Sequence, residues 1–148
     1  MTKFLIIFFL FSLGLLFYSC EQKTEENLDL ENKVKKIEEV NKLEKTVISY
    51  DSIFDAGEVK KGKEVTAIFK CKNIGSQPWQ IAEISPSCGC TNATKAPEKP
   101  IAVGDSFEIK ASVDTKNFSS DKFEKTVTVL SNCQEPVLIL RIIGKLIK

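Results

Sequence analysis

The sequence predicts an all-β domain, an immunoglobulin-like antiparallel β-sandwich of about seven strands, over residues 47–148. From about Val47 onward, short runs of alternating apolar and polar residues are separated by Gly, Pro, Asn and Asp, which is the pattern of a β protein. About seven such runs in roughly 100 residues suit a sandwich of this kind. The whole chain has 148 residues, enough for one globular domain of ordinary size.

The predicted strands follow one another closely from residue 48 to the C-terminus. Residues 48–59 give a first strand or strand pair, and residues 64–72 give a strand in which every second side chain is apolar. The run that contains Ile81 and Ile84 changes its period by one residue, which indicates a β-bulge. The remaining predicted strands are residues 107–113, 123–129 and 137–147, the last of which is apolar on both faces.

The first 19 residues are typical of an export signal. Lys3 supplies a positive start, and residues 4–17 are almost wholly apolar but shorter than the ~20 residues of a membrane-spanning helix. An ordinary cleavage site has small residues at positions −3 and −1, whereas a cut after Ser19 places Phe17 at position −3. Residues 1–19 are therefore predicted to be a signal peptide with a poor ordinary cleavage site.

The end of this segment, Tyr18-Ser19-Cys20, resembles a bacterial lipobox. The resemblance implies that the signal is cut before Cys20, that the Cys20 sulfur is acylated, and that the new amino terminus carries a further chain such as palmitate. The alternative is an unremarkable Cys near a signal end. The lipid would anchor the protein in a bacterial cell envelope. We expect the outer membrane, with the domain in the periplasm or at the cell surface.

Residues 20–46 are predicted to be a charged linker. Residues 21–46 contain no Gly, Pro or aromatic residue and are rich in Glu, Lys and Asn. Leu30, Val34, Ile37 and Val40 recur at helical spacing, so a short amphipathic helix is possible. Such a helix would bind a partner or form a coiled coil. A solvated spacer is the favoured alternative, because fewer than three heptads are present.

The composition argues against several functions. Lys plus Arg total 21 and Asp plus Glu total 20, so no strong positive charge for nucleic acid is present. The chain has no His, the commonest general base and metal ligand. We expect no cofactor, no metal and no catalytic residue. A metal site would have to use Cys thiolates and carboxylates alone.

Residues 87–91, Ser-Cys-Gly-Cys-Thr, follow a β-like run and open a polar loop. The spacing of Cys88 and Cys90 suits a disulfide, and Gly89 would allow the positive φ that so small a ring is expected to need. Ser87, Gly89 and Thr91 are then the candidate residues of a binding loop. The alternative is a pair of small, semi-apolar residues at a strand end.

Four motifs of the β domain resemble the bacterial domain of unknown function numbered fifteen seventy-three. They are residues 54–59 (FDAGEV), 69–75 (FKCKNIG), 87–91 (SCGCT) and 129–132 (VLSN). The similarity runs from about Ile53 to the C-terminus. It implies an immunoglobulin-like fold related to the ASH, MSP and hydin modules, and a lipoprotein of a Bacteroidetes-type envelope. It implies no established activity.

Cys71 and Cys133 are predicted to form a second disulfide. Cys71 lies on the inward face of its strand and Cys133 follows the strand that ends near Leu130, positions that resemble the inter-sheet bridge of immunoglobulin domains. With Cys20 lipidated and Cys88 joined to Cys90, these two thiols remain to pair.

Two functions fit these observations. The first is a membrane-anchored envelope lipoprotein with a non-catalytic module that binds protein or glycan through a sheet edge or loop, or that serves as a structural module. The second is a thiol-disulfide or thiolate-metal protein that uses Cys88 and Cys90. The second lacks a Cys-X-X-Cys motif at a helix N-terminus, the usual device for lowering a thiol pKa.

Overall fold

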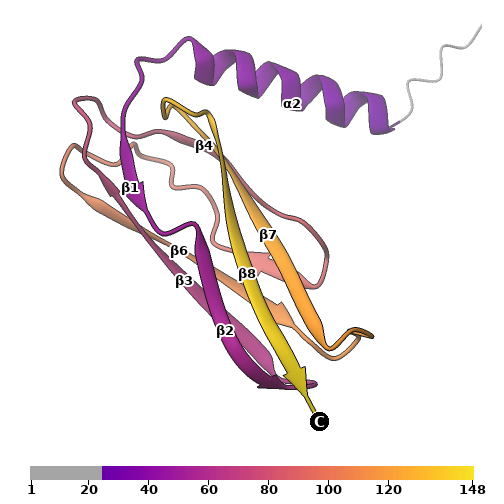
Figure 1. Ribbon diagram of the computed structural model, residues 1–148. Coiled ribbons are helices and arrows are strands. Elements are labelled where there is room, and N and C mark those ends of the chain that lie inside the picture. Colours follow the sequence, from indigo (N-terminus) through magenta and orange to yellow (C-terminus); the bar gives the residue numbers. More distant parts are fainter. Residues whose placement is uncertain (1–24) are drawn as a thin grey trace, which may run out of the picture. The chain divides into compact units, whose positions relative to one another are not determined.

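The computed structural model describes residues 25–148, and Figure 1 shows their arrangement. The predicted signal peptide and Cys20 lie outside the described residues. The compact unit that contains the β domain is Val34–Lys148. None of the described helices is both long enough and apolar enough to cross a bilayer.

The described residues form eight strands in two facing sheets, so the predicted all-β sandwich is confirmed. One sheet has the order β1-β3-β6-β5 and the other β2-β8-β7-β4. The strands are β1 (Ile48–Tyr50), β2 (Ile53–Lys60), β3 (Glu64–Asn73), β4 (Ile81–Pro86), β5 (Thr91–Ala93), β6 (Ser106–Asp114), β7 (Lys122–Ser131) and β8 (Val137–Ile147).

Two details differ from the predicted pattern. The described residues contain one strand more than the seven that the sequence predicts. The additional strand is β5, which has three residues and lies where the sequence predicts only a loop. All pairs of described strands are antiparallel except β2 and β8, which run parallel. This exception arises because β1 pairs with β3 in one sheet, and the chain then passes through Asp51 and Ser52 and continues as β2 in the other sheet.

Alternating side chains of the two sheets form the core, as the period-2 pattern predicts. Every second residue of β3 is buried, and Ala67 and Phe69 are at most 2% exposed. Trp79 is fully buried and meets Phe107 edge-to-face with ring centroids 6.4 Å apart. The predicted bulge in β4 is present between Ile81 and Glu83.

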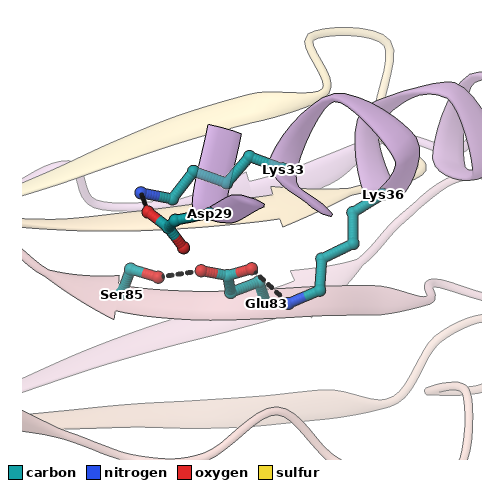
Figure 2. A network of polar contacts seen from close by, with 5 residues as sticks. All are labelled: Asp29, Lys33, Lys36, Glu83 and Ser85. Atoms are coloured by element: carbon teal, nitrogen blue, oxygen red, sulfur yellow. Dashed lines mark hydrogen bonds and ion pairs between the residues drawn. The ribbon is translucent and has the colours of Figure 1, made fainter. Parts of the chain in front are cut away.

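The linker contains the helix α2 (Glu25–Asn41), which confirms its helical character. In its first half, Asp29 and Lys33 form an i,i+4 ion pair of 2.7 Å. In its second half, Lys36 Nζ lies 2.6 Å from Glu83 Oε2 on β4, and Ser85 donates a hydrogen bond to the same carboxylate (Figure 2). Val40 is 3% exposed. Val34 and Ile37 are exposed, so the second half of the helix contacts the domain through Lys36 and Val40 and does not bury a continuous apolar face.

Candidate functional site

The Cys-Gly-Cys segment forms a crossover between the two sheets. It connects β4, at the edge of one sheet, to β5, at the edge of the other. We call residues 87–91 the crossover loop. The loop therefore closes one side of the sandwich, a position that sequence periodicity alone did not predict.

Backbone hydrogen bonds attach the crossover loop to both sheets. On the β7 side, Ser87 N donates to Thr126 O over 2.9 Å, and Thr126 N donates back to Ser87 Oγ over 3.2 Å. On the β6 side, Asp114 N donates to Cys90 O over 2.9 Å. Within the loop, Thr91 N donates to Cys88 O over 3.1 Å. Each end of the loop is thus fixed by a strand of a different sheet.

Cys88 and Cys90 are joined by a disulfide, with Cα atoms 5.3 Å apart. Both residues are half-buried, and the buried Thr91 places its Oγ1 3.4 Å from Cys88 Sγ. Ser87 and Gly89 are exposed. The arrangement brings all five predicted loop residues together in one rigid turn. Chemically, the bond can hold this surface in one shape or be reduced by an incoming thiol.

The expected role of Gly89 is wrong. The glycines with positive φ are Gly57, Gly62 and Gly104, so the small ring closes with ordinary backbone angles at Gly89. A Cβ built on Gly89 would meet no atom within 4 Å. The turn therefore does not require glycine at this position, either for its conformation or for its space.

The predicted bond between Cys71 and Cys133 is absent, since the structure holds both as free, buried thiols. Cys133 lies beyond β7 in a segment bridged to Thr46, so it does not occupy the strand position that an immunoglobulin bridge uses. Its sulfur accepts a hydrogen bond from Ser131 Oγ over 3.2 Å. Burial, with a smaller effect of the nearby Cys133, raises the pKa of Cys71 to about 11. Burial also raises the pKa of Cys133. Both thiols are thus protonated and poorly reactive at neutral pH.

Asn132 holds the chain where it enters the sandwich. Its Nδ2 donates to Glu44 O and Pro78 O at 2.9 and 3.0 Å, and its Oδ1 accepts from Gln80 N at 2.8 Å. Its carbonyl accepts from Thr46 N at 3.0 Å. Asn132 is 4% exposed, so these bonds satisfy a buried amide.

Asn73 makes the second half of this attachment. Its Oδ1 accepts from Thr46 Oγ1 at 2.8 Å and from Gly75 N at 3.2 Å, while its Nδ2 donates to Gln77 O at 2.8 Å. A Cβ on Gly75 would lie 2.4 Å from Val47 N, so only glycine fits there. We call Asn73, Gly75 and Asn132, with the segment 44–46 that they hold, the clamp. Two of the family-like motifs therefore serve this attachment, a role that the sequence reasoning missed.

The clamp and the crossover loop lie at opposite ends of the sheet that contains β3. Asn73 is the last residue of β3 and Glu64 is the first. Glu64 pairs with Asp114, whose N–H donates a hydrogen bond to Cys90 O. The nine intervening steps of strand correspond to roughly 30 Å at ~3.3 Å per residue. The fold thus fixes the chain's entry at one end and the disulfide toward the other.

A shallow groove of 620 Å³ lies on the outer side of β2, β8 and β7. Its floor includes Ile143 and Gly144, and a Cβ on Gly144 would come within 2.6 Å of the Phe123 ring. At its rim Glu58 and Lys145 form a 2.9 Å ion pair, and this hydrogen bond raises the pKa of Lys145. Among the described residues, no three Cys, Asp or Glu side chains gather as metal ligands would.

Together these features define a small immunoglobulin-like module with a clamped entry segment and a disulfide-closed crossover. The chain belongs to the family described as "Protein of unknown function (DUF1573)", whose model matches residues 47–146. The predicted family is therefore confirmed, whereas its Bacteroidetes-type lipoprotein character stays a prediction. No curated protein sequence matches the chain.

Several solved structures share the fold. A protein of unknown function from Porphyromonas gingivalis has a TM-score of 0.60 at 18% identity, over 69% of this chain and 47% of that chain. An ASH/PapD-like domain of human CEP192 has a TM-score of 0.52 at 8% identity, over 70% of this chain and 87% of that chain. The secreted serine protease VesC from Vibrio cholerae has a TM-score of 0.54 at 14% identity, over 81% of this chain and 26% of that chain. This chain spans about half of the Porphyromonas structure. At these identities the likeness shows the fold alone.

Proposed function

We propose that this protein is a lipid-anchored lipoprotein of a bacterial envelope, whose sandwich is a non-catalytic binding or structural module. Cys20 is its anchor, and the outer membrane is the expected site. The observation that carries the proposal is the clamp. A chain that is tethered from its N-terminal side enters the sandwich through segment 44–46, and this segment is hydrogen-bonded to Asn73 and Asn132.

The clamp gives the tethered domain a defined direction. A flexible attachment would let the sandwich rotate freely, whereas the bonded segment fixes the end at which the chain enters. The crossover loop then lies toward the opposite end, with exposed Ser87 and Gly89 on a turn held by both sheets. A rigid loop loses little conformational entropy when it binds, so the crossover loop is the proposed contact with an envelope protein or glycan.

A pull-down from envelope extract tests this role. We expect the domain to retain a protein or glycan, and a Gly89→Lys variant to lose it, since the added side chain projects from an exposed position that has room for it. Ser49→Lys, on the exposed face of β1 at the clamp end, is the matched control and should behave as wild type. If the wild type retains nothing above background, the binding role is wrong.

One observation favours a second function, thiol-disulfide exchange. The disulfide of Cys88 and Cys90 is half-buried, so a partner thiol can approach it from the exposed Gly89 side. In such a reaction, attack on one sulfur releases the other as a thiolate and forms a mixed disulfide. Turnover with a dithiol substrate that disappears in the Cys88→Ser/Cys90→Ser variant would establish this function in place of the first.

A further inference from the structure

The hydroxyl of Thr91 is buried against the disulfide of the crossover loop. Thr91 is 2% exposed and pairs with the fully buried Val113 on β6. Directly paired residues of an antiparallel ladder point to the same face, so the Thr91 side chain faces the inside of the sandwich. Among the described residues, the hydrogen-bond partners of Thr91 Oγ1 are the two sulfurs, Cys88 Sγ at 3.4 Å and Cys90 Sγ at 3.9 Å.

The direction of this hydrogen bond follows from the chemistry of the disulfide. The sulfurs of a disulfide carry no hydrogen, so Thr91 Oγ1 is the donor. A neutral sulfur is a weak acceptor, and a buried donor with a weak acceptor keeps part of its desolvation cost. A thiolate is a charged acceptor and forms a much stronger hydrogen bond. The hydroxyl therefore favours the state in which the sulfur beside it carries negative charge.

The two sulfurs are not equivalent with respect to Thr91. Cys88 Sγ is the nearer one, and Thr91 N also donates to Cys88 O over 3.1 Å. In thiol-disulfide exchange one sulfur is attacked and the other leaves as a thiolate. A donor that is already placed at the leaving sulfur stabilises the charge that develops there in the transition state. Departure of Cys88 is therefore favoured over departure of Cys90.

We propose that Thr91 directs exchange at this disulfide, so that a partner thiolate attacks Cys90 and Cys88 leaves as the thiolate. The bond between the two sulfurs breaks, and a bond between the partner sulfur and Cys90 Sγ forms. The electron pair of the broken bond stays on Cys88 Sγ, which accepts the hydrogen bond of the Thr91 hydroxyl. This role rests on the proposed thiol-disulfide exchange and assigns its direction.

The same geometry selects the kind of partner. Cys88 stays two residues from Cys90, with Cα atoms 5.3 Å apart in the closed ring, so its thiolate can attack the mixed disulfide and expel the partner. A partner with a single thiol is then released unchanged. In a partner with two neighbouring thiols, the second thiolate attacks the partner sulfur that is joined to Cys90, and Cys90 leaves as a thiolate. The partner dithiol is oxidised to a disulfide and the Cys88–Cys90 bond is reduced. The substrate class is therefore a protein dithiol.

Trapping with a monothiol identifies the attacked sulfur. The full chain with its disulfide formed is mixed with glutathione, excess maleimide rapidly blocks the released thiol, and tandem mass spectrometry locates both adducts. We expect glutathione on Cys90 and maleimide on Cys88, in about tenfold excess over the reverse arrangement, because a hydrogen bond to a charged acceptor has about this effect. Equal amounts of the two arrangements, or glutathione mainly on Cys88, would overturn the proposal.

Substitutions of Thr91 give the second test. Thr91→Val removes the hydroxyl and keeps the branched shape, so reduction by dithiothreitol should slow about tenfold and the preference for Cys90 should disappear. Thr91→Ser keeps the hydroxyl and should react as the wild type does, a rescue that a purely structural role of Thr91 would not give. A folded Thr91→Val that reacts like wild type would contradict this role. Both reagents probe the bond itself, whereas the lack of a protein dithiol that the chain oxidises would refute the proposed exchange function, so the two failures are distinguishable.

Discussion

The hydroxyl of Thr46 donates a hydrogen bond of 2.8 Å to the side-chain oxygen of Asn73, across 27 residues of chain. Both residues are at most 1% exposed. Thr46 belongs to the segment through which the linker enters the sandwich, and Asn73 ends β3. A single buried hydrogen bond therefore connects the entry segment 44–46 to the end of β3.

Asn73→Ala should destabilise the domain strongly. The change leaves the carbonyl oxygen of Gln77, the hydroxyl of Thr46 and the N–H of Gly75 without their partner. Each buried polar group left unsatisfied costs about 1–3 kcal/mol, so we expect a loss of about 3 kcal/mol or more. Urea unfolding measures it. Asn92→Ala, at an exposed position of β5, is the control and should change the unfolding free energy by less than about 0.5 kcal/mol.

Gly89→Ala should be tolerated, whereas Gly144→Ala should not. Gly89 has ordinary φ and open space, so an added methyl meets nothing. At Gly144 the methyl would come within 2.6 Å of the buried Phe123 ring, and overpacking of this kind costs about 1–3 kcal/mol. Thermal unfolding of both variants, with mass analysis of the Cys88–Cys90 bond, checks this. A large loss at Gly89 would contradict the observed geometry of the turn.

Removing the crossover disulfide should cost little stability. A ring this small contributes only about 1.6 kcal/mol in the chain-entropy model. In Cys88→Ser/Cys90→Ser the hydrogen bond from Ser87 N to Thr126 O and the one from Asp114 N to the carbonyl of residue 90 remain. We therefore expect a folded variant whose unfolding midpoint falls slightly and whose loop amides exchange faster. Global unfolding of the variant would show that the bond supports the whole fold.

Cys71 should make stability depend on alkaline pH. The fold raises the pKa of this thiol from its ordinary 9.0 to about 11, so the folded state binds the proton more tightly than the unfolded state. The stabilisation is complete below pH 9 and is lost between pH 9 and 11, by about 2 to 3 kcal/mol. The unfolding free energy of wild type and Cys71→Ala, measured between pH 7 and 11, checks this, and the variant should lack the part of the pH dependence that Cys71 contributes.

Thiol titration gives an independent check on the same residues. In the native protein a thiol reagent should label neither Cys71 nor Cys133 at pH 7, and in denaturant it should label both, because both are free and buried. If denatured, unreduced protein yields no free thiol, these residues are paired as the sequence first suggested.

The sequence predicts the fold well where one face of a strand is buried. In β3 and β6 apolar side chains at every second position meet the core, so period 2 locates both strands. It does not locate β5, whose three residues are too few to show a period. The sequence also does not predict that the end of the linker contacts the domain. This contact consists of buried Val40 and the Lys36–Glu83 ion pair, which the composition of the linker does not indicate.

The candidate site was predicted in part. Local spacing is enough to propose the bond between Cys88 and Cys90, because residues two apart can have the Cα separation that a disulfide tolerates, here 5.3 Å. It is not enough for Cys71 and Cys133, whose relation depends on the segment beyond β7. The signal for the clamp was present as two Asn residues inside apolar motifs. Their partners are mostly backbone groups of distant loops, which no sequence pattern identifies.

Membrane fractionation with palmitate labelling of wild type and Cys20→Ser tests the central claim most directly. More than one acyl chain gives stable anchoring, so wild-type protein should carry label and stay with the membrane after a salt wash. Cys20→Ser should lose the label and appear in the soluble fraction. A Cys20→Ser protein that remains in the washed membrane, or a wild type without label, would contradict the lipid anchor.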